Sequence, residues 1–307
     1  MTPLIILLYT LFASSFTMGK LLSTHTSPIF LTAIRMILGG FILLIYQIIT
    51  KAHRTVTIER RDLWALLQIM LFGVYFNYIL RFWALAYLPS FKTCFLFNFS
   101  PFFSSLYSYI AFNEKLSKQQ WIGLLIGFCG MIPVLISNTN EIDLPEKFFI
   151  SLPEVAVLIS VAMHSYSWIL VRHLVKNRAY NPTFINSTTM TVGGLLALVT
   201  SLAIEVVPPL ENSASFIGWL LFVVLISNVF CHNLYGHLLK TYTATFLSFC
   251  AFLTPILAAI LGSLFLHETI GVTFYFSVVV VFIGLYLFYK HELDQIKTQD
   301  LTASDHV

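Results

Sequence analysis

The chain has 307 residues, of which 58% are hydrophobic and only 10% are charged, and its mean hydropathy is +0.84. This balance excludes a soluble fold and indicates a protein that folds in a lipid bilayer. The formal net charge of +3 is small, so the distribution of the charges along the chain is more informative than their sum.

Ten apolar segments are long enough to cross the bilayer as helices, which takes roughly 20 residues each. They cover residues 3–22, 28–50, 64–86, 90–111, 118–137, 152–173, 182–204, 214–237, 243–266 and 270–289. The sequence therefore predicts an all-α membrane protein with ten transmembrane helices. Little sequence lies between these segments, so no soluble catalytic domain is expected.

The second half of the chain repeats the first at an offset of 154 residues. Eight residues carry the repeat: Pro28, Gly39, Gly40, Phe95, Pro101, Glu114, Phe128 and Gly130 recur as Pro182, Gly193, Gly194, Phe249, Pro255, Glu268, Phe282 and Gly284. Each half holds five spans, and an odd number turns the second copy over, as in many secondary transporters. We expect a first repeat at 1–137, an external linker at 138–151, a second repeat at 152–290 and a flexible cytoplasmic tail at 291–307.

The basic residues gather on one side of this topology. Of the 17 Lys and Arg residues, 12 lie there: Lys51, Arg54, Arg60, Arg61, Lys115, Lys118, Arg172, Lys176, Arg178, Lys240, Lys290 and Lys297. Cytoplasmic loops are enriched in Lys and Arg, so both termini are predicted to be cytoplasmic in a multi-pass cytoplasmic-membrane protein. The same rule accounts for the short basic loops, so no nucleic-acid partner is predicted.

The fourth span of each repeat holds a proline near its centre, Pro101 and Pro255. Each proline removes a backbone hydrogen bond and crowds the carbonyl of Phe97 or Ala251, four residues earlier. In lipid, a freed carbonyl needs another partner or a wet cavity. A tolerated kink and a hinge beside a central cavity both remain open, and the matching positions favour the hinge.

Glycines lie within several spans, where they predict close packing of helix backbones. Gly123 and Gly127 have the GxxxG spacing, and Gly284 lies in the tenth span. A homodimer contact through the fifth and tenth spans is one interpretation, and a monomer is the other.

These features together resemble the drug/metabolite transporter superfamily, and most closely its EamA-type repeat. The residues that carry the resemblance are Pro101 with Glu114, Pro255 with Glu268, the glycines Gly130 and Gly284, and Arg35. The resemblance implies that a metabolite crosses a cytoplasmic membrane by alternating access, through a cavity lined by helices 1, 3, 4, 6, 8 and 9. Thr189 stands at the position that matches Arg35, so that charge is present in one repeat only. Glu114 and Glu268 are interpreted as helix-end caps, with a symmetric gate as the alternative.

Three cations are predicted in the outer half of the membrane: Arg35, Arg81 and Lys92. Ionisable groups inside a span are costly, so each is a candidate site residue. Together they would attract a carboxylate or a phosphate. The alternative is that their side chains reach the outer headgroups. Glu154, at the start of the sixth span, could neutralise one of them.

Polar and aromatic residues on the predicted cavity helices complete the candidate substrate site. They are Ser14, Asn77, Phe95, Asn98, Phe99, His164, Trp168, Asn228, His232 and Phe249. Asn77 and Arg81 share one helical face, and so do Lys92, Phe95 and Phe99. A cation with aromatic rings and amides suits a ligand that has both a charge and a flat body, whereas the alternative is an aromatic packing stripe.

No span holds a central Asp or Glu, so the usual carboxylate for proton coupling is missing. Exchange or facilitated transport is therefore favoured over proton coupling through a histidine. We predict a secondary transporter, without cofactor or metal, for an amino acid or a derivative such as S-adenosylmethionine. The alternatives are an exporter of drugs or lipophilic cations and a nucleotide-sugar or sugar-phosphate carrier. An enzyme is not expected, because no metal or nucleophile motif is present.

Overall fold

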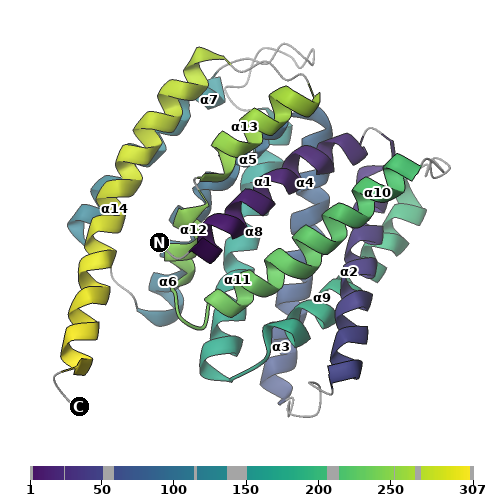
Figure 1. Cartoon of the computed structure of the whole chain (residues 1–307), viewed down its shortest axis with the longest axis horizontal. Coiled ribbons are helices and arrows are strands. Elements are labelled where there is room, and N and C mark those ends of the chain that lie inside the picture. Colours follow the sequence, from purple (N-terminus) through teal and green to yellow (C-terminus); the bar gives the residue numbers. More distant parts are fainter. Residues whose placement is uncertain are drawn as a thin grey trace.

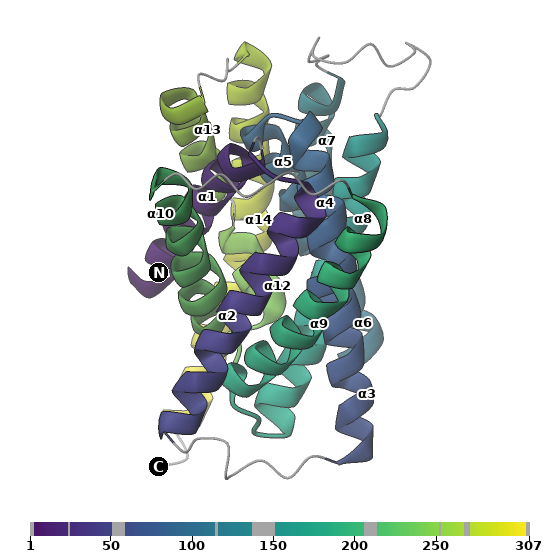
Figure 2. The same ribbon diagram turned by 90° about the vertical axis from the view of Figure 1, so that its right-hand side faces the viewer.

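The computed structural model describes residues 3–23, 25–50, 59–113, 116–136, 151–205, 214–251, 253–266 and 271–304. Within these ranges all regular secondary structure is helical (Figure 1). Six helical segments are apolar and long enough to cross a membrane: residues 4–23, 28–50, 60–87, 152–177, 182–204 and 215–238. The protein is therefore a multi-pass membrane protein, and Figure 2 shows most of its helices running along one common direction.

The described residues of the first half form nine helical segments. In chain order they are α1 (Pro3–Ser23), α2 (Pro28–Thr50), α3 (Arg60–Gln68), the π-helix η2 (Ile69–Tyr75), α4 (Phe76–Tyr87), α5 (Ser90–Leu96), the 3₁₀-helix η3 (Phe97–Phe99), α6 (Ser100–Phe112) and α7 (Lys118–Ile136).

The second half follows the same plan. It contains α8 (Leu152–Arg172), the π-helix η4 (His173–Asn177), α9 (Pro182–Ile204), α10 (Ala214–Val223), the π-helix η5 (Val224–Cys231), α11 (His232–Leu238), α12 (Ala244–Cys250), α13 (Leu253–Leu266) and α14 (Val272–Ser304). The π-helices η2 and η5 interrupt the third predicted span of each repeat at matching positions. Such turns are frequent at functional sites.

The proline-containing spans are interrupted helices. In the first repeat, the 3₁₀-helix η3 separates α5 from α6, and Pro101 lies in the first turn of α6. In the second repeat, α12 ends at Cys250 and α13 begins at Leu253, so that Pro255 lies in its first turn. A first-turn residue needs no backbone N–H for the helix, so proline is tolerated there. At the same place in each repeat, the predicted bend is therefore a break between two successive helices.

Glycines allow equivalent helices of the two repeats to touch at their backbones. α2 packs against α9, where a side chain on Gly40 would come within 2.7 Å of the backbone N of Thr191. α7 packs against α14, where a side chain on Gly284 would come within 2.5 Å of the backbone N of Gly127. The glycine face that the sequence also allowed for a dimer is therefore used inside the chain.

Each predicted repeat is followed by a polar segment, the linker after the first and the tail after the second. α14 continues as a helix to Ser304, where the sequence predicted a flexible tail from residue 291, because its polar end still consists of good helix formers. The predicted linker at 138–151 lies outside the described residues except for Ser151, and so do Glu114 and Glu268.

Candidate functional site

A cavity lies between the two repeats and contains about 780 Å³ of empty space, counted with its open side. Its lining comes from α1, α4, the α5–η3–α6 segment, α8, the η5–α11 segment and the α12–α13 segment. These are the first, third, fourth, sixth, eighth and ninth predicted spans, the six that the family resemblance implied.

Half of the lining residues form pairs at equivalent positions of the two repeats. The pairs are Tyr78 with His232, Arg81 with Tyr235, Cys94 with Ser248, Phe97 with Ala251, and Ser100 with Thr254. The cavity therefore lies where the inverted repeats face each other. In the pair Arg81 and Tyr235, only the residue of the first repeat is a cation.

Arg81 is the charged centre of the cavity wall. Its Cζ lies 4.0 Å from the ring centroid of Tyr78, 5.1 Å from Phe97, 5.4 Å from Phe82 and 5.7 Å from Phe16. Aromatic faces attract a guanidinium, but they do not neutralise it. Among the described lining residues none is Asp or Glu, and the buried Nε of Arg81 has no hydrogen-bond partner in the described chain. The arrangement therefore suits an anionic ligand group.

Arg35 lies behind this wall and does not line the cavity, contrary to the sequence prediction. Its side chain is fully buried, its Cζ lies 4.6 Å from the ring centroid of Phe82, and its Nη2 donates to Asn228 Oδ1 at 3.3 Å. Asn228 is also fully buried and faces Met36 Sδ at 3.2 Å. α2, which carries Arg35, packs most extensively against α9, and it does not contribute to the lining of the cavity.

His232 connects the two repeats. Its Nδ1 lies 2.7 Å from the carbonyl oxygen of Ser227, in the π-helix η5, so Nδ1 carries the ring proton and donates it. Nε2 then accepts from the Tyr78 hydroxyl at 2.7 Å. Because Tyr78 and His232 are equivalent positions, this bond joins the repeats at the centre of the cavity.

Trp168 and Asn77 lie beside the two ring nitrogens of His164. Nε2 accepts from Trp168 Nε1 at 3.0 Å, and Nδ1 lies 3.3 Å from Asn77 Nδ2. An indole N–H can only donate, so a proton on Nε2 would face another N–H. This geometry opposes His164 as a proton acceptor in this conformation. Asn77 supports His164 from behind the cavity wall and also donates to Gly73 O at 3.0 Å.

Lys92, Phe95 and Phe99 were predicted to face the substrate, but they lie outside the cavity wall. Lys92 Nζ lies 2.8 Å from Glu154 Oε1, and both side chains are buried. Phe95 packs against Phe274 with ring centroids 5.9 Å apart, and Phe99 lies in the same apolar cluster. The helix turns this face toward α8 and α14, while neighbouring residues face the cavity.

Two further predictions concern α1 and α12. Ser14 Oγ donates to Leu11 O at 2.8 Å, and the adjacent Ser15 lines the cavity instead. The side chain of Phe249 lies outside the described residues. Of the predicted substrate residues, those that line the cavity are Arg81, Asn98, His164, Trp168 and His232.

Sequence reasoning did not select several aromatic lining residues. They are Tyr9, Phe12, Phe16, Tyr78, Phe82, Phe97 and Tyr235. The repeat held a usable signal for two of them, because Tyr235 is equivalent to Arg81, and Tyr78 is equivalent to His232. The other aromatics are indistinguishable in sequence from packing residues.

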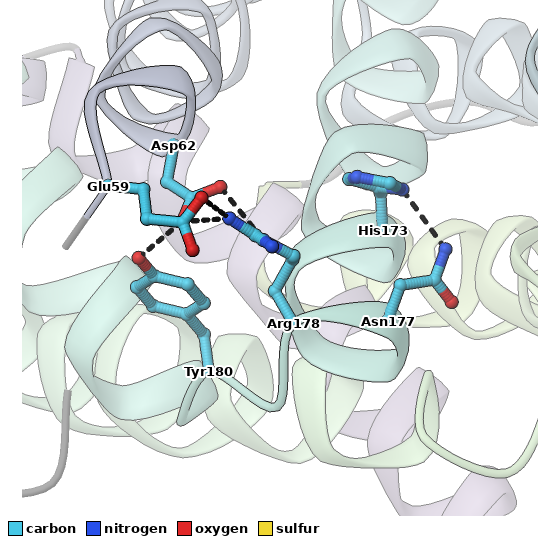
Figure 3. A network of polar contacts seen from close by, with 6 residues as sticks. All are labelled: Glu59, Asp62, His173, Asn177, Arg178 and Tyr180. Atoms are coloured by element: carbon cyan, nitrogen blue, oxygen red, sulfur yellow. Dashed lines mark hydrogen bonds and ion pairs between the residues drawn. The ribbon is translucent and has the colours of Figure 1, made fainter. Parts of the chain in front are cut away.

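A second polar network lies at the predicted cytoplasmic end of α3 (Figure 3). Arg178 forms a fork with Asp62, with Nε 3.2 Å from Oδ1 and Nη2 3.3 Å from Oδ2, and it also pairs with Glu59. The Tyr180 hydroxyl donates to Asp62 Oδ2 at 2.7 Å. Burial and this hydrogen bond raise the pKa of Tyr180 to about 12, so it remains a donor at physiological pH. The network ties the turn before α9 to the first repeat.

This network includes a strained backbone position. Ala179 has a φ of 56°, which is uncommon for a residue other than glycine. It holds Arg178 and Tyr180 on the same carboxylate. Within the described residues, no group of three or more His, Cys, Asp or Glu side chains could hold a metal ion.

Comparisons with known proteins agree with this two-repeat organisation. The profile of the "EamA-like transporter family" matches residues 2–136 and again residues 152–290. An S-adenosylmethionine/S-adenosylhomocysteine transporter of Chlamydia muridarum is 30% identical over 93% of this chain and 90% of its own length. One from Chlamydia trachomatis is 30% identical over 93% and 88%. A solved crystal structure aligns with 92% of this chain over 93% of its own length. The TM-score is 0.65 at 14% sequence identity, which shows a similar fold.

Proposed function

Because this chain belongs to the EamA-like transporter family, we propose that it carries S-adenosylmethionine and S-adenosylhomocysteine, or close amino-acid derivatives, by alternating access. In this proposal ten helices cross the cytoplasmic membrane and both termini are cytoplasmic. The named relatives are transporters, so the chain is a transporter and not an enzyme. The substrate passes through the cavity between the two repeats.

The observation that carries the proposal is the uncompensated Arg81 in an aromatic wall. A ligand with a carboxylate can pair with the guanidinium, while a purine can stack on aromatic side chains such as Phe97 and Trp168. S-adenosylmethionine and S-adenosylhomocysteine have both groups. The names of the chlamydial relatives support the same substrate class.

The alternatives fit the cavity less well. A carrier of lipophilic cations would use acidic side chains, and the described lining residues include none. A nucleotide-sugar or sugar-phosphate carrier would use several cations for a doubly charged group, whereas Arg81 is the one Lys or Arg among the described lining residues. The cavity thus matches a ligand with one anionic group.

The same residues bear on whether transport is coupled to protons. The described lining offers no carboxylate to carry a proton, and the hydrogen bonds of His164 oppose its protonation. Exchange of one substrate molecule for another needs no proton carrier. We therefore propose exchange, with facilitated transport as the limiting case when no partner substrate is present.

The test is uptake of labelled S-adenosylmethionine into proteoliposomes that contain purified protein. We expect uptake to rise when the vesicles are loaded with unlabelled S-adenosylhomocysteine and to be insensitive to collapse of a pH gradient. Arg81→Ala should lower uptake at sub-saturating substrate by roughly 10- to 100-fold, because a charge-assisted contact is lost. Lys240→Ala, which removes an exposed cation at the predicted cytoplasmic end of α11, is the control. Uptake that requires a pH gradient, or that is indifferent to Arg81, contradicts the proposal.

A further inference from the structure

Three buried hydrogen-bond donors without a partner in the described chain belong to residues that line the cavity. They are Nε of Arg81, Nδ2 of Asn98 and Oγ1 of Thr254. The side chains of Asn98 and Thr254 are 2% and 4% exposed. A buried donor without a partner is costly, and native proteins rarely keep several of them together. All three residues line one cavity, which favours a ligand that accepts hydrogen bonds.

The three donors come from the interrupted helices of both repeats and from α4. Asn98 belongs to the 3₁₀-helix η3, and Thr254 lies in the first turn of α13. α13 has 14 residues and begins in the middle of its predicted span, so the positive end of its dipole lies at the cavity. In transporters, interrupted helices of this kind direct such ends at anionic substrate groups.

The repeat-equivalent positions explain why the donors belong to one subsite and not to two. Ser100, the equivalent of Thr254, already shares a hydrogen bond with Ser165 at 3.0 Å. Tyr235, the equivalent of Arg81, carries no charge. The donor set therefore exists once, despite the internal symmetry of the fold.

We propose that Arg81, Asn98 and Thr254 form a carboxylate subsite that binds the α-carboxylate of the substrate and sets its orientation in the cavity. This inference rests on the proposed function. The subsite has one positive charge and neutral N–H and O–H donors, which match a singly charged group with two oxygens. A phosphate with two charges would leave one of them uncompensated in a buried site. The purine then extends toward the remaining aromatic wall, which includes Trp168.

The experiment compares two ligands that differ only in this group. Affinities of the purified protein in detergent are measured by calorimetry for S-adenosylmethionine and for its decarboxylated analogue. We expect the wild type to bind S-adenosylmethionine at least about tenfold more tightly, because the analogue leaves the three donors without an acceptor. Asn98→Leu and Thr254→Val should each lower the affinity for S-adenosylmethionine by roughly five- to tenfold and leave that for the analogue unchanged.

Matched variants separate recognition from folding. Thr93→Val removes another buried hydroxyl, which donates to Pro89 O at 3.2 Å on α5 and does not line the cavity, so the ratio of the two affinities should stay as in the wild type. Thr254→Ser keeps the hydroxyl and should retain most of the wild-type ratio. A Ser variant as unselective as the Val variant overturns the role of Thr254.

The outcomes for the wild type also separate the subsite from the proposed function. Equal affinity for the two ligands overturns the carboxylate subsite and leaves the transport proposal intact. Binding of neither ligand overturns both.

Discussion

Equivalent positions of the two repeats are used alike where helices pack and differently where the cavity lies. Gly39 makes room for Asn228, whose Cβ would lie 2.8 Å from an added Cβ, and its equivalent Gly193 makes room for Val74, whose Cγ1 would lie at 2.8 Å. Asn228 and Val74 are themselves equivalent. The packing contact is therefore repeated, although the side chain that fills it has changed.

The cavity wall shows the opposite behaviour. Arg81 and Tyr235 are equivalent and both line the cavity, yet only Arg81 is charged. Tyr78 and His232 are equivalent and bond to each other across the repeats. The comparison shows that tight helix packing keeps glycine at equivalent positions such as Gly39 and Gly193, whereas a lining position must suit a substrate that lacks the internal symmetry.

The two ends of the molecule differ in the same way. At the predicted cytoplasmic end, Asp62 pairs with Arg178. Its equivalent at the other end is Phe216, whose ring contacts that of His25 with centroids 6.2 Å apart. A phenylalanine cannot form an ion pair, so the contacts at the two ends are not chemically interchangeable.

The largest effect is expected from breaking the repeated packing. Gly284→Leu would drive a side chain into the backbone N of Gly127 and the backbone O of Gly123, which lie 2.5 and 2.6 Å from an added Cβ. Backbone atoms cannot rotate away, so α7 and α14 would separate, at a cost of about 3 kcal/mol or more. The melting temperature in detergent should fall and the protein should aggregate on a sizing column.

The control is Gly218→Leu, because an added Cβ at Gly218 meets no atom within 4 Å. It should behave as the wild type. If both variants were equally stable, the glycine contact between the repeats would have no structural role.

An intermediate effect is expected from the bond that joins the repeats. Tyr78→Phe removes the hydroxyl that His232 Nε2 accepts from, at a cost of about 1 kcal/mol, so substrate affinity should fall roughly fivefold. His232→Leu should weaken binding as well, and the double variant should be no worse than the stronger single variant. The readout is calorimetric affinity for S-adenosylmethionine. Additive losses would mean that the two side chains act independently.

The smallest effect is expected at the Asp62–Arg178 network, because Arg178 is exposed. Arg178→Gln removes the pairing with Asp62 and should lower the melting temperature only slightly, because exposed ion pairs contribute little to stability. The resulting fall in melting temperature should shrink when salt is raised from about 0.05 M to about 0.5 M, since salt screens the pair. Lys176→Gln, a nearby exposed cation, should show neither change. A salt-independent loss would point to packing around Ala179 in place of charge.

The sequence alone predicted the membrane environment, the internal repeat and the family, because these depend on composition and on spacing along the chain. Polar groups are rare within apolar spans, and among those that the sequence selected as candidates, the ones that line the cavity are Arg81, Asn98, His164, Trp168 and His232. Ten spans were predicted, and six described segments are apolar and long enough to cross a membrane.

Tertiary structure decided which face of each helix meets the cavity. Phe95 and Phe97 are two residues apart and alike in sequence, yet Phe95 packs against Phe274 and Phe97 lies beside Arg81. Residues two apart point to opposite sides of a helix, and the sequence of this segment does not say which side meets the cavity. Lys92 likewise meets Glu154 only because α8 packs against α5, so its partner is set by contacts between segments far apart in the chain. Spacing along one helix fixes which residues share a face, but only packing between helices fixes what that face contacts.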